Sequence, residues 1–462
     1  MKPIILINAV GLTPRLLEHA PRLSAVAKAG WVANMPEVLP AVTCTAQATI
    51  LTGQLPSAHG VVANGWLFRD TNEVRFWQQS NRLMQAEPVY ATAKRRAKER
   101  GRHFEAAKLF WWFNQGADVE FSVTPKPWYG VDGNKAFGIS SSPAGLEMAM
   151  SLERMYGRFP FPSFWGPTAG RKCTEWIAEA AGQVVFEWTP DLTLVYLPHL
   201  DYEPQRHGPS GCDMAKHVRE LDDACAPLLD AATKAGADVW VVSEYGHCDV
   251  DTPVLPNRVL RATGLLSVRR GPFGEQLDLY DSRAVAVVDH QLAHVYVKDA
   301  ADIPRVRDLL APLEGVDRVL VGDERSAIGL DHERSGEIVL LAKPTAWFAY
   351  PFWLDDAAAP DYARAVAIHH KPGFDPCELF WDPKLFAPKL RAAKRLIQKK
   401  LGFRTIFDVV PLDPTLVRGS HGLAASDPRD RPVLIGHGPN PGESVPMTGV
   451  RDLLLNALDL QD

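Results

Sequence analysis

The feature that most constrains the fold is an alternation, near the N-terminus, of short apolar runs and helix-like segments. Residues 4–7 are an unbroken Ile and Leu run that leads to Gly11, which is typical of a buried strand that ends in a turn. The same alternation recurs, with predicted strands at residues 4–7, 32–38, 192–197 and 239–242 and predicted helices at residues 14–29 and 43–51. Strands separated by helices favour an α/β fold, with a mostly parallel central sheet and helices on both faces.

Two stretches interrupt this pattern and suggest how the chain is divided. Residues 104–167 are rich in aromatic residues, Pro and Gly and have weak periodicity, which indicates a cap over one end of the sheet. Residues 284–342 instead read as strand, helix, strand, strand, which predicts a small inserted α+β lobe. The expected division is core residues 1–103, cap 104–167, core 168–283, lobe 284–342 and core completion 343–462.

Composition narrows the class of protein. The net charge of −5 gives no general attraction for a nucleic acid polymer or an anionic surface. No run approaches the roughly 18 apolar residues of a membrane helix, so no integral membrane segment is expected. The six cysteines are scattered and form no CxxC pair, and no signal peptide is recognisable, so we expect a cytoplasmic protein.

One segment departs from this acidic balance. Residues 384–404 are basic, with Lys and Arg at positions 389, 391, 394, 395, 399 and 400. Such a helix binds a membrane surface or a partner protein, or it is a solvated helix whose Leu390, Leu396 and Leu401 turn inward. The sequence alone favours the solvated helix.

Polar residues that could take part in catalysis or metal binding follow the predicted strands. Ligands of parallel sheets bind at the carboxyl ends of the strands, so residues 6–12, 40–45, 198–209 and 243–247 are expected to converge there. The late His421 could join them. The convergence would assemble one hydroxyl nucleophile, Thr43, with oxygen and imidazole groups suited to a divalent metal: Asp201, His207, Glu244, His247 and His421. His290 and His294, by contrast, are expected to support a strand of the lobe.

A family resemblance emerges from the residues around Thr43. Pro40-Ala41-Val42-Thr43 is followed by Thr52-Gly53, by His59-Gly60 and by Asn64. This succession resembles the alkaline phosphatase superfamily, and within it the nucleotide pyrophosphatase/phosphodiesterase branch. The resemblance extends to Ser420-His421-Gly422 and so covers most of the chain.

The resemblance implies an activity and a cofactor. It implies a phosphoric-ester hydrolase of the phosphodiesterase or pyrophosphatase type, which acts on a small-molecule phosphoester or pyrophosphate. Thr43 would be the nucleophile that becomes phosphorylated, and Asn64 would hydrogen-bond the phosphate. One or two divalent ions, by resemblance zinc, would be held nearby.

The metal ligands implied by the family are only partly present. Asp201 and His421 match one ion, but Gln205 stands where that ion usually has a His. The second ion would be bound by Thr43 and by an Asp-His pair, which here reads Glu244-Tyr245. The first strand offers Asn8, and Val10 occupies the usual Asp position. Gln and Asn bind divalent ions more weakly than His or carboxylate, so an ordinary two-zinc site is not implied.

Three hypotheses account for these replacements. His207, His247, His369 or His370 could substitute for the missing ligands. Alternatively, Asp201, His421 and Glu244 could hold one ion, either zinc or a metal such as manganese or iron. In the third hypothesis the site is catalytically inactive, and the protein has a binding or assembly role.

Overall fold

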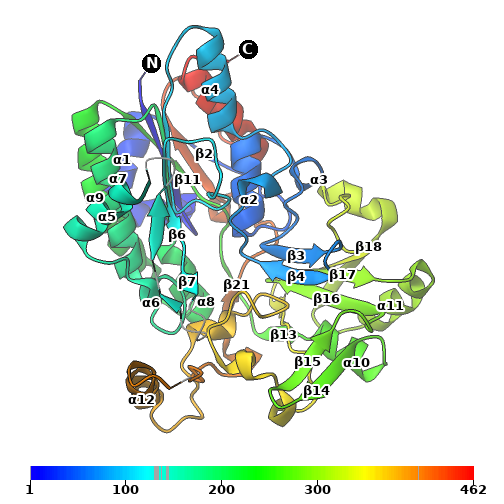
Figure 1. Cartoon of the computed structure of the whole chain (residues 1–462). Helices are drawn as coiled ribbons and strands as arrows, with labels where there is room; N and C mark the ends of the chain where they lie inside the picture. Colours follow the sequence, from blue (N-terminus) through cyan, green and yellow to red (C-terminus); the bar gives the residue numbers. More distant parts are fainter. Residues whose placement is uncertain (1, 130–134, 137, 142–144, 404, 462) are drawn as a thin grey trace.

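An eight-stranded sheet forms the centre of the larger part of the molecule (Figure 1). The computed structural model describes the chain except for residues 1, 130–134, 137, 142–144, 404 and 462. In spatial order the strands are β2 (Trp31–Asn34), β22 (Val433–Gly436), β11 (Asp238–Val242), β1 (Ile4–Ala9), β10 (Leu192–Leu197), β5 (Ala106–Leu109), β6 (Phe121–Pro125) and β9 (Ile139–Ser141). The five strands from β11 to β6 pair in parallel, and antiparallel pairing is confined to the flanks.

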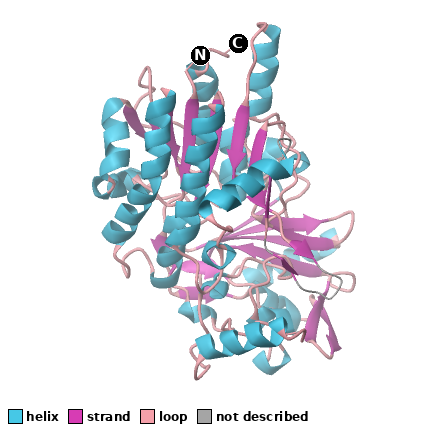
Figure 2. Cartoon of the chain, turned by 60° about the vertical axis from the view of Figure 1, so that its left-hand side comes forward, coloured by secondary structure: helices cyan, strands magenta, loops and turns pink. Residues whose placement is uncertain are grey.

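Helices cover both faces of this sheet, as the sequence predicts. Every residue of β1 and β10 is buried, which is expected of parallel strands that are covered on both faces. Ile5 and Ile7 pack in the core with α1 (Pro21–Ala29), α7 (Arg171–Trp188) and α9 (Met214–Ala235). Ile4 and Leu6 point the other way, toward α2 (Thr43–Thr52), α4 (Val89–Glu99) and α13 (Val450–Ala457). Figure 2 shows the strands between these two helical layers.

The early elements agree with the predicted alternation, with one local difference. The helix expected over residues 14–29 is divided into a 3₁₀ segment (Pro14–His19) and α1, which begins at Pro21. Proline has no backbone N–H and restricts the residue before it, so it starts a helix more readily than it continues one. The strand expected over residues 32–38 is the shorter β2.

The aromatic-rich segment of residues 104–167 contributes to the sheet itself. We expected it to cap the sheet, but β5, β6 and β9 all belong to the main sheet. These strands have three to five residues, so the surrounding Trp, Phe, Pro and Gly residues hide their periodicity in the sequence. Residues 130–134, 137 and 142–144 of this segment lie outside the described residues.

A four-stranded antiparallel sheet lies beside the main sheet (Figure 1). Its strands are β16 (Ala284–Asp289), β17 (Leu292–Val297), β19 (Ile338–Ala342) and β18 (Val316–Val321), with α11 (Ile303–Leu310) between β17 and β18. The expected succession of strand, helix, strand and strand is therefore present, preceded by β16. A tight turn at His290 and Gln291 joins β16 to β17 and reaches toward the carboxyl end of the main sheet, since Gln291 N donates to His421 O.

The remaining elements are short and complete the loops around the two sheets. The helices are α3 (Pro56–His59), α5 (Gly145–Tyr156), α6 (Phe161–Phe164), α8 (Tyr202–His207), α10 (Pro256–Ala262) and α12 (Pro388–Lys400). The strands are β3 (Gly65–Phe68), β4 (Glu73–Phe76), β7 (Trp128–Tyr129), β8 (Lys135–Ala136), β12 (Cys248–Asp249), β13 (Thr252–Val254), β14 (Ser267–Gly271), β15 (Gly274–Asp278), β20 (Ala346–Phe348) and β21 (Gly419–Ser420). Within the described part of the chain, no helix has the length and apolar character needed to cross a membrane.

Candidate active site

Thr43 begins helix α2 at the carboxyl edge of the main sheet. The residue that caps the helix is Val42, so Thr43 is already the first helical residue and its hydroxyl is not used as a cap. The side chain is buried. The first N–H groups of a helix lack partners within the helix and carry partial positive charge, so this end of α2 favours a phosphate.

A buried tyrosine connects Thr43 to the carboxylate of Asp201. The hydroxyl of Tyr245 lies 3.1 Å from Thr43 Oγ1 and donates to Asp201 Oδ1 at 3.1 Å. A phenol has one hydrogen, so Thr43 must be the donor in its own contact with Tyr245. The lone pairs of Thr43 Oγ1 are then directed away from Tyr245, which is the orientation that a nucleophile needs.

Asp201 is also the centre of a buried group of imidazoles. His247 Nε2 lies 3.1 Å and His421 Nε2 lies 3.8 Å from Asp201 Oδ1. These three side chains place their potential ligand atoms within 4.8 Å of one another. Gly11, with a positive φ of 75°, makes room for them, because a Cβ atom there would lie 3.0 Å from the His247 ring.

The charge state of this group suits a cation. Burial opposes the ionisation of Asp201, but its hydrogen bond with His247 helps to lower its pKa to about 2. Burial holds the pKa of His421 well below its usual value, so this ring is neutral. His421 Nδ1 donates to the Ala41 carbonyl at 2.7 Å, which leaves the Nε2 lone pair free to bind a metal. Nε2 has no hydrogen-bond partner among the described residues.

Glu244 faces amide groups instead of imidazoles. Asn8 Nδ2 and Gln47 Nε2 donate to Glu244 Oε1 at 2.6 and 2.7 Å. Burial raises the pKa of Glu244 to about 8, so the carboxyl group is largely protonated at neutral pH. Tyr245 cannot provide the missing charge, because burial raises its pKa and its ring stacks on His421 with the centroids 3.5 Å apart.

Asn64 holds the first turn of α2 and is itself held by Asp289. Its Oδ1 accepts the Cys44 N–H at 2.9 Å, and its Nδ2 donates to Asp289 Oδ1 at 3.1 Å. One Nδ2 hydrogen remains for a substrate. Burial raises the pKa of Asp289 to about 7. His290 Nδ1 also contacts Asp289, at 2.7 Å, and the His290 ring packs on His421 with the centroids 3.7 Å apart.

The structure thus gathers some of the predicted residues and leaves others outside. Thr43, Asn64, Asp201, His421, Glu244, Asn8 and Tyr245 all belong to this connected network, and His247 is the histidine that joins it. Gln205 is fully buried, and neither of its amide atoms has a hydrogen-bond partner among the described residues. His207 is exposed and pairs with Glu203. His369 is exposed and contacts the Phe76 carbonyl at 3.3 Å, so neither histidine belongs to the group around Asp201.

Three members of the network were not identified from the sequence. Gln47 lies one helical turn after Thr43, and nothing in the sequence distinguishes it from other polar helix residues. Asp289 and His290 come from the lobe, and only the turn between β16 and β17 brings them to the main sheet. The left-handed backbone of His290, with a φ of 58°, is unusual for a residue other than glycine, and such strain often marks a functional site.

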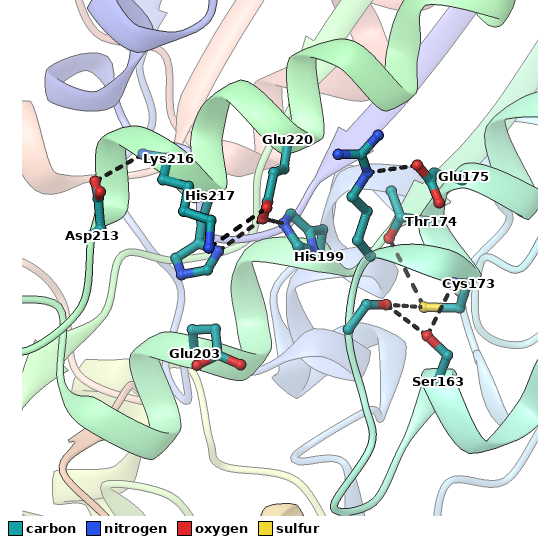
Figure 3. A network of polar contacts seen from close by, with 12 residues as sticks. Ser163, Cys173, Thr174, Glu175, His199, Glu203, Asp213, Lys216, His217 and Glu220 are labelled. Atoms are coloured by element: carbon teal, nitrogen blue, oxygen red, sulfur yellow. Dashed lines mark hydrogen bonds and ion pairs between the residues drawn. The ribbon is translucent and has the colours of Figure 1, made fainter.

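A separate polar network joins His199, His217 and Glu220 (Figure 3). Glu220 Oε2, on α9, accepts from His199 Nε2 at 3.1 Å and from His217 Nδ1 at 3.0 Å. The carboxylate uses one oxygen for two imidazole N–H donors, so the contacts are satisfied as hydrogen bonds. Because His199 and Asp201 are the first and last residues of one three-residue 3₁₀ segment, this network ties the Asp201 turn to α9.

The donors around Asp201 fit a single divalent ion. A buried carboxylate and two imidazoles are a usual ligand set for zinc that leaves a coordination position open. The group around Glu244 does not fit a second ion, because the amide N–H groups of Asn8 and Gln47 both point at Glu244 Oε1. Glu244 also belongs to no cluster of metal-ligating side chains among the described residues. Of the described residues, only Asp201, His247 and His421 form a cluster of metal-ligating side chains in this site.

The fold and this site define an α/β protein of the alkaline phosphatase superfamily. Residues 4–375 match the sequence model of the type I phosphodiesterase / nucleotide pyrophosphatase family, and the chain belongs to that family. Family members are metal-dependent phosphoesterases. A search of curated protein sequences finds no significant match.

Solved structures with the same fold include proteins with different activities. Murine ectonucleotide pyrophosphatase/phosphodiesterase 5 superposes with a TM-score of 0.59 at 15% identity, over 100% of this chain and 96% of the murine chain. Phosphonoacetate hydrolase from Sinorhizobium meliloti, in complex with phosphonoformate, superposes with a TM-score of 0.60 at 15% identity, over 99% and 96% of the two chains. At this identity the comparison establishes the shared fold.

Proposed function

We propose that the protein is a phosphodiesterase or nucleotide pyrophosphatase that uses Thr43 as its nucleophile and one divalent metal ion. The observation that carries the proposal is the buried chain from Thr43 through Tyr245 to Asp201 and its two imidazoles. Asp201, His247 and His421 would hold the ion, for which zinc suits the carboxylate and imidazole donors. Asn8, Gln205, Glu244 and Tyr245 would not bind a metal.

Each residue of this hydrogen-bonded series has a distinct role in the proposed reaction. The bound ion would add positive charge next to Thr43 and the phosphate. Thr43 Oγ1 attacks phosphorus in line and gives up its proton to solvent, so a Thr43 O–P bond forms as the bond between phosphorus and the leaving oxygen breaks, and the leaving oxygen takes up a proton from solvent. Tyr245 keeps the Thr43 hydrogen on the side away from phosphorus. The remaining N–H of Asn64 and the first turn of α2 stabilise the charge that develops on the phosphoryl oxygens.

Hydrolysis of the phosphothreonine completes the cycle. Water attacks phosphorus opposite Thr43, the O–P bond to Thr43 breaks, and the threonine oxygen regains a proton. Asp289 keeps Asn64 in place throughout, through contacts to both its side chain and its backbone N–H. An inactive variant of murine ectonucleotide pyrophosphatase/phosphodiesterase 5 has been solved with AMP, which supports nucleotide esters as a substrate class to test first.

The substitution Thr43→Ala tests the nucleophile. We expect it to lower the hydrolysis of bis-p-nitrophenyl phosphate and of dinucleotide pyrophosphates by at least about a thousandfold. Thr45→Ala is the matched control, since Thr45 lies on the same helix but donates to the Val61 carbonyl at 3.2 Å. We expect the control to retain activity within a few-fold.

Two outcomes would contradict the proposal. Equal activity of Thr43→Ala and the wild-type protein would exclude the threonine as nucleophile. A metal-loaded wild-type protein that binds nucleotides but hydrolyses no diester, pyrophosphate or monoester would instead support the binding role.

A further inference from the structure

The surface of α12 and its flanking turns differs from the rest of the molecule. Seven of the 17 exposed large apolar side chains in the described part of the chain lie between residues 386 and 406. They are Phe386, Leu390, Leu396, Ile397, Leu401, Phe403 and Ile406. The expectation that Leu390, Leu396 and Leu401 turn inward is wrong, because these side chains are 72%, 51% and 69% exposed.

Three of the four exposed apolar side chains of residues 390–401 lie on one side of the helix, and Leu396 lies beside them. With 3.6 residues per turn, Leu390, Ile397 and Leu401 share a face. Ala392 is buried on the opposite face, and Arg395 on that side bonds Asp408 at 3.0 Å. The helix therefore packs on the protein through small and ion-paired residues and presents its apolar residues to solvent, contrary to a globular helix.

Positive charge flanks this apolar stripe. Lys389 and Lys400 lie on one side of it and Lys394 on the other, and α12 contains six basic residues and no acidic residue. The net charge of the whole chain is −5, so the basic residues are concentrated here against the overall balance. Figure 1 shows α12 at the lower margin of the molecule, away from the main sheet.

We propose that α12 and its flanking turns dock the protein on the surface of a bilayer that contains anionic phospholipids. An amphipathic helix with a basic border and large apolar side chains lies in the interface, with its apolar side among the acyl chains and its lysines at the headgroups. Charge complementarity selects this occupant over a second copy of the chain, because two copies would bring two basic helices together. The proposal is independent of the catalytic role of Thr43.

Vesicle co-sedimentation of the full-length protein tests the proposal. We expect binding to phosphatidylcholine vesicles that contain about a quarter phosphatidylserine, at least about tenfold weaker binding to pure phosphatidylcholine, and loss of binding in about 0.5 M NaCl. The triple variant Leu390→Ser/Ile397→Ser/Leu401→Ser should lower the bound fraction by at least about tenfold. Lys389→Glu/Lys394→Glu/Lys400→Glu should do the same through charge alone.

A matched control uses exposed apolar residues elsewhere. Phe186 and Phe273 are 63% and 62% exposed, so Phe186→Ser/Phe273→Ser removes exposed apolar side chains outside α12 and should leave vesicle binding unchanged. All of these side chains face solvent, so the substitutions should leave the melting temperature unchanged. Measuring it checks that each variant is folded. The proposal is overturned if the wild-type protein does not bind anionic vesicles, or if the triple Ser variant binds them as well as the wild type does. It is equally overturned if light scattering without lipid shows a dimer that this variant abolishes.

Discussion

The substitution Tyr245→Phe isolates the hydroxyl that connects Thr43 to Asp201. Phenylalanine keeps the ring that stacks on His421, so it preserves the shape of the site. It removes both polar contacts of the phenol, each of 3.1 Å. Asp201 then loses one donor, and the Thr43 hydroxyl loses the acceptor that fixes the direction of its hydrogen.

The size of the effect follows from the nature of these bonds. A hydrogen bond to a charged group contributes about 1.5–3 kcal/mol. If that orientation energy is used in the transition state, kcat/KM should fall by about 10- to 150-fold. The fall should appear mainly in kcat, because Tyr245 is placed to orient the nucleophile and not to bind the leaving group.

The assay is steady-state hydrolysis of bis-p-nitrophenyl phosphate at saturating metal, with melting temperature and metal content measured in parallel. If the metal content is unchanged, the fall in kcat is due to the orientation of Thr43 and not to loss of the ion. If Tyr245→Phe keeps kcat within about twofold of the wild-type value, less than 0.5 kcal/mol, the orienting role of the hydroxyl is refuted.

Three further substitutions test other contacts of the site. In metal-free protein, Glu244 has a folded-state pKa near 8, above its ordinary value of 4.5, so its contribution to stability is full below pH 4.5 and is lost as pH rises toward 8. Denaturant unfolding should show that, between pH 5 and pH 8, the wild-type protein loses roughly 2–4 kcal/mol relative to Glu244→Gln; parallel profiles would contradict this. Asp289→Asn should lower kcat by roughly tenfold through Asn64, and adding it to Asn64→Ala should cost little more, whereas fully additive losses would separate the two residues.

The sequence predicts the elements that carry the chemistry better than it predicts their surroundings. The Ile run before Gly11 and the Thr43 helix are local patterns, and both are present as expected. The helices on both faces of the sheet follow from the same alternation. The short strands among the aromatic residues of 104–167 carry too few residues to show a period, so their place in the main sheet depends on tertiary packing.

The candidate site shows the same division between local and long-range information. Thr43, Asp201 and His421 lie in recognisable motifs, so their convergence could be anticipated. His247 was one of several histidines that could replace a missing ligand, and only the packing of its ring against Gly11 and Asp201 distinguishes it. Asp289 and His290 belong to a different sheet. They reach the site through contacts between residues more than 200 positions apart in the sequence, which no motif predicts.

The same limit applies to α12. Periodicity places its leucines on a face of the helix, but it cannot state whether that face meets the core or solvent. The structure places small and ion-paired residues inward, which the hydrophobic pattern alone would not predict.

The metal content of the site is the most direct test of the central claim. Elemental analysis of the purified, metal-loaded protein should give about one divalent ion per chain, and Asp201→Asn or His421→Ala should remove it. Glu220→Gln is the control, since its carboxylate is used by His199 and His217, and it should leave the ion in place. Two ions per chain, or one ion that survives the loss of Asp201 and His421, would contradict a single-metal site beside Thr43.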